Sequence, residues 1–549
     1  MVLPKNLRRT LIASAAVSAL LMTGCAGSTS APENEPLEMQ RGLTSTPAGS
    51  GPVDLVTWNL IWGEPSSLDW VYAYSDSDNT ALANMCEGLM RQNEDMTLSN
   101  ALAEKVDRPD DKTIVFTIRD DVKFWDGTPL TAEDVEFSLN RNRDADVGSY
   151  WSSPFYDRVK SIEVTGDREV TVSFSQPDSL FERMMATAAG IIGSKKYVEQ
   201  AGATYGTASG GIMCTGPFTF DSWQPGSKLT MSANPDYWDA ELRPMVAKLD
   251  LTFVTDEATV SNSLFSGDID GTYMPPLSAT SKLLESGDGA FVLGLGTDWM
   301  AIRPTEKDGP LQQLEVRQVL SLLLDRDAVA KAVFRGTADP AITPIQPGAW
   351  GYAKEQWQAA FDALPAPTFD IAKASELVKS AGLEGTELTI AIPADSEAEQ
   401  KIAEILSAGA SQAGITMNFE TLPTTSFTEL YFDDKARANY DGFIAWEYGA
   451  GVADPVVSMS EFTPLSAYNY GNNDDEVLTQ SVSDALSTFD EATRAGLLIT
   501  GQQQMIDNLP LIPVVNLQNR LYQNPRITGA TASRSSLYYP WAAKIGAAK

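Results

Sequence analysis

Histidine is absent from the 549 residues of this chain. Serine and cysteine hydrolases with a histidine base, zinc hydrolases with histidine ligands and haem sites with a proximal histidine all need that side chain. The sequence therefore excludes these classes of site. It leaves open hydrolysis by a pair of carboxylates, as in glycosidases, because that chemistry needs only Asp and Glu.

Nucleotide-binding and metal-binding motifs are also missing. The P-loop pattern G-x-x-x-x-G-K-[ST] does not occur, and "TASGGIMCTGPF" (207–218) lacks the G-x-G-x-x-G spacing. The stretch "DSDNTA" (76–81) begins like a calcium loop, but Thr80 and Ala81 stand where a ligand and the turn glycine are needed. We interpret it as a polar turn or a helix cap. No metal and no cofactor are predicted.

No apolar run is long enough to span a bilayer, which takes roughly 20 residues. The one near the amino terminus, Leu11 to Met22, follows basic residues and is typical of an export signal. Thr23 and Gly24 precede Cys25 and resemble the lipobox at which bacterial lipoproteins are cleaved and lipidated. The alternative is an ordinary secretory signal with an incidental cysteine, which would leave an exposed thiol in an oxidising compartment.

Residues 26–51 are rich in Ser, Thr, Pro, Gly and Glu and contain few large apolar side chains. Such a composition predicts a flexible tether. We therefore expect a signal peptide over 1–24 and a lipidated Cys25 with its tether over 25–51. The lipid on Cys25 would hold an exported protein at the outer face of the cytoplasmic membrane.

Basic residues are scarce relative to acidic ones, 40 against 73, which gives a net charge of −33. The excess is spread along the chain and opposes binding to nucleic acid or to anionic lipid surfaces. We predict no nucleic-acid partner. The simplest role of the charge is to keep an exported protein soluble.

The rest of the chain, from residue 52, is globular, α/β and long enough for two or three domains. "TPLTAEDV" predicts a helix that begins after Thr131, because Asp134 three residues later completes a cap. Strands are predicted from clustered or alternating β-branched and aromatic residues at 55–60, 112–119, 168–174, 228–233 and 247–254. Helices are predicted at 80–90, 131–142, 257–265, 313–334, 370–381 and 397–412.

Several phrases, taken together and in order, resemble the extracellular solute-binding proteins of family 5, the peptide, opine and nickel class that serves ABC importers. Trp125 stands where that family often has histidine. The phrases are "TIVFTIRDDVKFWDGTPLTAEDVEFSLNR", "CTGPFTFDSWQPGSKLTMSANPDYWD", "LFSGDID", "EVRQVLSLLLDRDAVAKAVFRG" and "NLPLIPV".

The resemblance implies a two-lobed, periplasmic-binding-protein-like α/β clamp. Its first lobe, 52–295, carries an extra subdomain, its second spans 296–514, and 515–549 returns to the first lobe. Two crossing segments act as the hinge. The implied function is capture of a small solute between the lobes and delivery to ABC permease subunits in the membrane, so the protein is not expected to be an enzyme.

Cysteine is scarce, with three residues in all. Once Cys25 is lipidated, Cys86 and Cys214 remain, an even number in an exported chain, and this favours a disulfide between them. The resemblance places both in the first lobe. The alternative is two buried free thiols.

The resemblance places the ligand between two loops. One holds Trp62 and Glu64, and Glu64 matches a ligand-facing glutamate of some peptide-binding members. The other is "AWEYGAGVADP", from Trp446 to Pro455. Peptide-binding relatives commonly have an aspartate three positions after this tryptophan to hold the peptide ammonium, and here that position is Gly449.

Glu447 and Asp454 are the candidate replacements for this aspartate, although Asp454 belongs to a D-P pair that usually shapes a turn. Trp446 and Tyr448 would suit stacking on sugar rings or, equally, packing in the core. Peptides are favoured over oligosaccharides as the ligand. The alternatives of another class are a lipid-anchored hydrolase with a carboxylate pair and a structural or chaperone lipoprotein that has lost its ligand.

Overall fold

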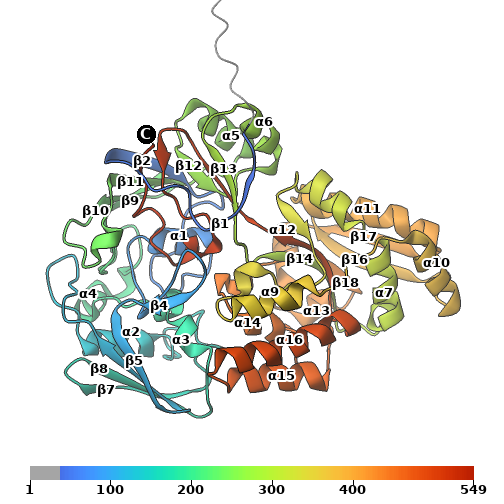
Figure 1. Cartoon of the computed structure of the whole chain (residues 1–549), viewed down its shortest axis with the longest axis horizontal. Helices are drawn as coiled ribbons and strands as arrows, with labels where there is room; N and C mark the ends of the chain where they lie inside the picture. Colours follow the sequence, from blue (N-terminus) through green and yellow to red (C-terminus); the bar gives the residue numbers. More distant parts are fainter. Residues whose placement is uncertain (1–36, 549) are drawn as a thin grey trace, which may run out of the picture.

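The computed structural model describes residues 37–548, which form two α/β lobes side by side (Figure 1). The predicted signal peptide and Cys25 lie outside the described residues. Within residues 37–548, no helix is long and apolar enough to cross a membrane. The chain crosses between the lobes twice, at 295–298 and at 518, and these two segments are neighbours because Leu517 N donates to Asp298 O at 2.9 Å.

The first lobe is built on an eight-stranded mixed sheet. Neighbouring β11, β2 and β12 run parallel, whereas β9, β10 and β20 pair antiparallel with their neighbours. In order across the sheet the strands are β1 (Gln40–Leu43), β13 (Ala290–Gly294), β20 (Asn519–Gln523), β12 (Gly271–Tyr273), β2 (Val53–Asn59), β11 (Val246–Thr252), β10 (Lys228–Ala233) and β9 (Phe218–Gln224).

The carboxyl-terminal segment completes the core of the first lobe. Trp541 packs on Trp58 of β2 with ring centroids 4.6 Å apart, and both side chains are fully buried. The indole N–H of Trp541 donates to Thr80 O at 2.9 Å. The last residues are therefore part of the first lobe, together with helices α1 (Asp76–Leu82), α5 (Glu257–Ser266) and α6 (Thr280–Glu285).

The predicted tether is shorter than expected at its carboxyl end. Residues 40–43 form β1 on the edge of the sheet, parallel to β13, and Thr46 is buried with its hydroxyl directed to Gln523. The composition misled the prediction because an edge strand needs only main-chain groups to bind its neighbour. Residues 37–51 thus belong to the first lobe.

An extra subdomain lies beside this sheet (Figure 1, lower left). Its four-stranded antiparallel sheet consists of β5 (Ala103–Asp110), β6 (Thr113–Ile118), β8 (Glu169–Phe174) and β7 (Val159–Gly166). Every second side chain of β6 is buried, as the alternation in the sequence predicts. The helices are α2 (Ala132–Arg141), α3 (Phe181–Met184) and α4 (Lys195–Ala201), and Thr131 and Asp134 cap α2 reciprocally. A hairpin of β3 (Met90–Gln92) and β4 (Leu98–Asn100) borders this subdomain.

The second lobe has a six-stranded sheet whose middle strands are almost fully buried. Its strands, in order, are β15 (Ala338–Pro340), β19 (Ile512–Leu517), β14 (Trp299–Pro304), β18 (Gly442–Glu447), β16 (Glu387–Pro393) and β17 (Thr416–Leu422). Its helices are α7 (Leu314–Leu323), α8 (Arg326–Ala328), α9 (Lys354–Asp362), α10 (Ile371–Ser380), α11 (Glu397–Ala413), α12 (Thr424–Glu429), α13 (Asp434–Arg437), α14 (Pro455–Ser460), α15 (Glu476–Leu486) and α16 (Glu491–Asn508).

Two predicted helices have other bounds. The helix expected at 80–90 begins earlier and ends at Leu82, because Ser75 and Asp78 form a capping box in the acidic stretch that we interpreted as a cap. The helix expected at 313–334 is interrupted. Leu324 has an extended backbone, and Asp325 then caps the next turn by accepting from Ala328 N at 2.9 Å.

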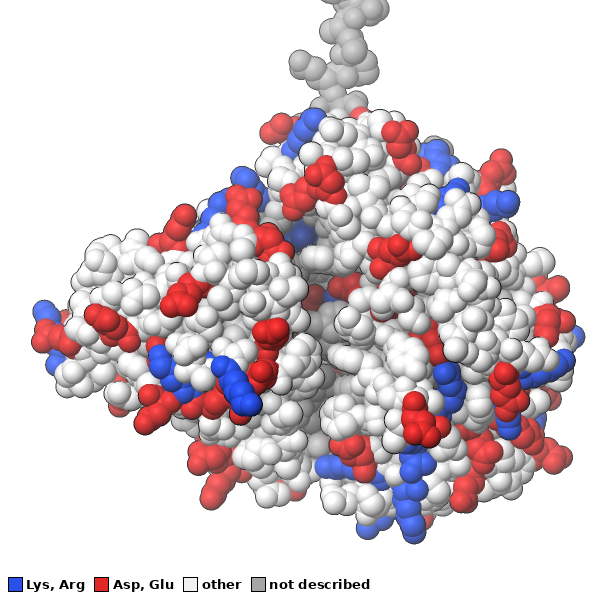
Figure 2. All heavy atoms as spheres, turned by 180° about the vertical axis from the view of Figure 1, so that it is seen from behind, with Lys and Arg blue, Asp and Glu red and all other residues white. Residues whose placement is uncertain are grey.

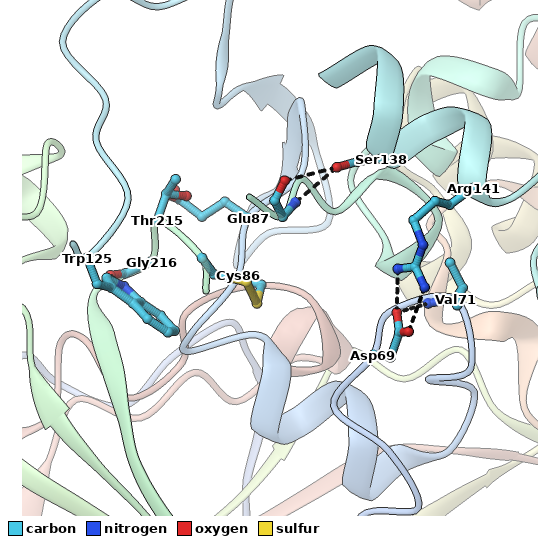
Figure 3. The surroundings of a disulfide bond; sticks show 11 residues. Asp69, Val71, Cys86, Glu87, Trp125, Ser138, Arg141, Thr215 and Gly216 are labelled. Carbon is cyan, nitrogen blue, oxygen red and sulfur yellow. Dashed lines mark hydrogen bonds and ion pairs between the residues drawn. A yellow bond between two sulfur atoms is a disulfide. The ribbon is translucent and has the colours of Figure 1, made fainter. Parts of the chain in front are cut away.

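The structure contains a disulfide between Cys86 and Cys214, the pair that the cysteine count favoured. Figure 3 shows it beside Glu87 and Thr215, the residues that follow each cysteine. The Thr215 hydroxyl donates to Glu87 Oε2 at 2.9 Å. The sulfur link and this hydrogen bond therefore fasten the same two backbone segments.

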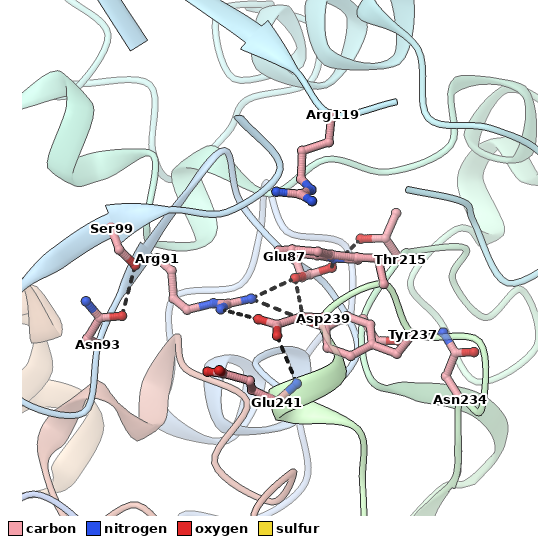
Figure 4. A network of polar contacts seen from close by, with 12 residues as sticks. Glu87, Arg91, Asn93, Ser99, Arg119, Thr215, Asn234, Tyr237, Asp239 and Glu241 are labelled. Atoms are coloured by element: carbon pink, nitrogen blue, oxygen red, sulfur yellow. Dashed lines mark hydrogen bonds and ion pairs between the residues drawn. The ribbon is translucent and has the colours of Figure 1, made fainter. Parts of the chain in front are cut away.

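Glu87 is also the centre of a buried polar network (Figure 4). Tyr237 and Trp238 of "NPDYWD" donate to its two oxygens at 2.6 and 3.0 Å, and Arg91 forms an ion pair with it at 3.4 Å. Both aromatic rings pack in an apolar cluster with Tyr539 of the carboxyl-terminal segment. Because both oxygens of the buried carboxylate have donors, its charge is compensated.

We expect loss of the disulfide to lower the stability of the first lobe. The cysteines are 128 positions apart, and in the chain-entropy model a loop of that length contributes about 4–5 kcal/mol. Replacing both by serine should reduce the free energy of unfolding in urea by an amount of that order. Two reactive thiols in the unreduced, unfolded wild-type protein would contradict the pairing.

Candidate functional site

A cleft runs between the lobes, and Figure 2 shows a hollow there with acidic and basic side chains in its depth. Trp62, just after β2, faces Trp446 of β18 edge to face, with ring centroids 6.1 Å apart. Trp62 is 55% exposed, the most exposed tryptophan among the described residues, whereas Trp446 is half-buried. The structure thus brings together one residue from each of the two predicted ligand loops.

A pocket opens beside Trp62 in the first lobe. Its walls come from the ends of β2 and β12, the start of α1 and residues 534–536. β2 and β12 are parallel neighbours, so their carboxyl ends meet at one edge of the sheet. This is the edge at which open α/β sheets bind ligands.

Arg534 lies in this pocket between two carboxylates. Its Nη2 is 2.8 Å from Asp76 Oδ1 and 3.1 Å from Asp298 Oδ2, and its Nε donates to Asp298 Oδ1 at 3.1 Å. Asp76 begins α1, whereas Asp298 belongs to a segment that crosses between the lobes. One buried guanidinium therefore joins the first lobe to the crossing.

The predicted aromatic residues surround this ion cluster. The Tyr448 ring lies 5.1 Å from the guanidinium carbon of Arg534, and Trp446 Nε1 donates to Asp298 Oδ2 at 3.4 Å. The pKa of Asp298 is raised to about 6, mainly by burial; Arg534 lowers it, and the charge of Asp76 raises it. The negative charge in the cluster is therefore only partly compensated.

Glu447 belongs to a second buried ion cluster, in the second lobe. Arg303 Nη1 binds Glu447 at 2.7 Å and Glu461 at 3.0 Å. Burial, followed by the charge of Glu447, raises the pKa of Glu461 to about 7, although Arg303 lowers it. Two carboxylates again share one guanidinium.

Asp454 caps α14 and accepts from Val456 N at 3.0 Å. Its side chain has no exposed surface and lies 2.6 Å from Arg494 Nη1 and 3.3 Å from Arg183 Nε. This corrects the expectation that Asp454 could replace the missing aspartate, because a ligand cannot reach it. Arg183 comes from the extra subdomain, so Asp454 instead forms an ion pair between the lobes.

Glu64 and Gly449 both have structural partners. Glu64 accepts from Trp223 Nε1 at 2.6 Å and from Gly226 N at 2.9 Å, so it fastens the Trp62 loop to the β9–β10 hairpin. Gly449 has a φ of 57°, and a Cβ there would lie 2.9 Å from Thr297 O. An aspartate at this position would be strained by both the backbone and the crossing segment.

The first lobe also carries an exposed aromatic pair. Tyr74 and Tyr150 stack with ring centroids 5.2 Å apart and are 52% and 47% exposed. Burial is the main cause that raises the pKa of Tyr150, and the charges of Tyr468 and Glu461, in the second lobe, raise it further. These rings therefore lie close to the second lobe.

The structure adds Asp76, Asp298 and Arg534 to the residues named from the sequence. Asp76 was visible only as part of a helix cap, and Arg534 lies in the ordinary stretch "TASRSSL". No local pattern signals a site that combines residues so far apart in the chain. Within residues 37–548, no three Cys, Asp or Glu side chains are grouped so as to hold a metal ion.

Comparison with known proteins gives a consistent result. The sequence pattern of the bacterial extracellular solute-binding proteins, family 5 Middle, matches residues 97–470. The dipeptide-binding protein DppE of Bacillus subtilis (strain 168) is 24% identical over 489 residues, 85% of this chain and 87% of DppE.

Two solved structures have the same two-lobed fold. The ABC transporter substrate-binding protein CtaP of Listeria monocytogenes superposes with a TM-score of 0.78 at 21% identity, over 92% of this chain and 100% of CtaP. DppA of Helicobacter pylori, in complex with the peptide STSA, superposes with a TM-score of 0.73 at 20% identity, over 91% of this chain and 99% of DppA.

The Glu461 cluster predicts a pH dependence of stability. Its folded-state pKa, about 7, lies above the usual 4.5, so the stabilisation from protonation is fully present below about pH 4.5 and is lost as the pH rises through 7. The melting temperature should therefore fall between pH 5 and pH 8, and Glu461→Gln should reduce that fall. Glu384→Gln, an exposed control, should leave it unchanged; equal curves for wild type and Glu461→Gln would contradict the assignment.

Proposed function

The chain belongs to the bacterial extracellular solute-binding proteins of family 5, and we propose that it is the lipid-anchored substrate-binding component of an ABC importer. In this proposal it captures a short peptide between its lobes and delivers it to permease subunits in the membrane. It acts by binding alone, and no bond of the ligand is broken.

One observation carries this proposal: the cleft is lined by residues of both lobes and of a crossing segment. Trp62 and Asp76 come from the first lobe, Trp446 and Tyr448 from the second, and Asp298 from the crossing. A solute that contacts both lobes favours their closed arrangement by its differential affinity. A permease can then distinguish the loaded protein from the empty one.

Peptides are the proposed ligand because DppE is a dipeptide-binding protein and DppA was solved with a peptide. Oligosaccharides are the second candidate. The exposed rings of Trp62, Tyr74 and Tyr150 favour them, since aromatic faces stack on sugar rings.

Titration calorimetry tests the choice. The purified protein would be titrated with peptides of two to five residues and, separately, with oligosaccharides of similar length, and each mixture would then be analysed by mass spectrometry. We expect a peptide to bind and to be recovered intact. Binding of sugars alone would overturn the peptide assignment, and cleaved products would overturn the transport function in favour of a hydrolase.

Trp446→Ala should weaken binding by about 1–3 kcal/mol, because truncation removes a large half-buried contact in the cleft. Phe369→Ala is the matched control, since Phe369 is an exposed aromatic that precedes α10, at the outer end of the second lobe (Figure 1). Calorimetry should show weaker binding only for the first variant. Unchanged affinity for Trp446→Ala would place the ligand elsewhere.

Membrane attachment is proposed to depend on Cys25, which follows a short apolar run and the small residues Thr23 and Gly24. Cys25→Ser should move the protein from the membrane fraction to the soluble fraction. The wild-type mass should exceed that of the chain from residue 25 by its lipid. A membrane-bound Cys25→Ser protein with an unchanged mass would contradict the lipid anchor.

A further inference from the structure

The ion cluster around Arg534 has an uncompensated negative charge. Arg534 is the only basic residue within 4 Å of the carboxylates of Asp76 and Asp298 in the described part of the chain, and these two groups exceed it by one charge. Arg520 also interacts with Asp298, but its interaction with Glu257 is the larger one, and this added pair is neutral. The five groups together remain one negative charge in excess.

Asp76 is the carboxylate that a ligand can reach. Its side chain is 20% exposed and lines the pocket, whereas that of Asp298 is 7% exposed and does not line it. Burying an uncompensated carboxylate is costly, and a cation placed against it removes that cost. The pocket therefore favours a positively charged group at Asp76.

A second, independent feature of the pocket also indicates a polar ligand. Ser77 lines the pocket and is 97% buried, with a relative exposure of 3%, yet its hydroxyl has no hydrogen-bond partner among residues 37–548. A buried hydroxyl normally has a hydrogen-bond partner. An ammonium group bound at Asp76 could donate a hydrogen bond to this hydroxyl.

The aromatic wall has the same preference. Two aromatic rings line the pocket, the exposed one of Trp62 and the buried one of Tyr273. Aromatic faces attract cations. An anionic group would instead meet a guanidinium that two carboxylates already occupy. The pocket thus suits the amino end of a ligand better than its carboxyl end.

We propose that Asp76 receives the protonated primary amine of the ligand, with Ser77 as a second hydrogen-bonding partner. Asp76 would then take the role for which the loop at Gly449 offers no side chain. This inference rests on the proposed function, because it assigns the amino end of a peptide to one part of the cleft.

The test combines a change in the ligand with a change in the protein. Trialanine and tetraalanine would each be titrated in free and N-acetylated form into the wild type, Asp76→Asn, Ser77→Ala and the control Asp236→Asn, an exposed carboxylate of the same lobe. Circular dichroism would verify that each variant is folded.

We expect N-acetylation to weaken binding to the wild type and to Asp236→Asn by on the order of 10- to 100-fold, the usual effect of losing a charged hydrogen bond. Asp76→Asn should bind the free peptides more weakly than the wild type does, by that same factor. It should no longer distinguish them from the acetylated peptides. Ser77→Ala should lower the affinity severalfold for the free peptides only. A merely structural role of Asp76 would weaken both ligand forms equally.

Three outcomes would overturn the inference. Equal binding of free and acetylated peptides to the wild type would do so while leaving peptide capture intact. A wild-type preference for free peptides that persists in Asp76→Asn and Ser77→Ala would assign the amine to another residue. If no peptide binds the wild type, the proposed function fails and the inference fails with it.

Discussion

Asp298 ties both crossing segments to the pocket. Its main-chain oxygen accepts from Leu517 N at 2.9 Å, just before the second crossing, and from Gln346 Nε2 at 2.6 Å. Its carboxylate meanwhile binds Arg534. Because one residue carries both sets of contacts, the charge in the pocket lies directly beside the two segments that cross between the lobes.

Away from the pocket the lobes meet through apolar packing, as at Val452 and Leu180, and through polar contacts. Gln92 of the first lobe donates to Gly451 O at 2.8 Å and accepts from Ala453 N at 3.0 Å, close to the ion pair of Arg183 with Asp454. Buried ion pairs add little net stability once desolvation is counted, but their geometry is specific. These polar contacts therefore define how the lobes meet more than they add to the stability of the contact.

The sequence predicted those parts of the molecule that depend on local patterns. The alternating strand at 113–118 and the cap at Thr131 have the expected forms, because side-chain periodicity and capping act over a few residues. The edge strand at 40–43 was missed because its stability comes from the main chain of β13.

The candidate site was only partly predictable for the same reason. Trp62 and Trp446 were found through a family resemblance, and the structure does bring them together. Asp76 and Arg534 are 458 positions apart in the sequence, and only the fold makes them partners. The D-P pair at Asp454 begins helix α14 instead of the turn that it usually shapes, and the two buried arginines of Asp454 have no local signature.

The disulfide closes the base of the extra subdomain, since every strand and helix of that subdomain lies between Cys86 and Cys214. The two Cα atoms are 5.0 Å apart, so the segment leaves and re-enters the first lobe at nearly one point. A fold tolerates an insertion most readily when the two ends of the inserted segment lie close together. This insertion is nevertheless not detachable, because its side chains share one hydrophobic core with the large sheet and its Arg141 binds Asp69 of the first lobe at 2.8 Å.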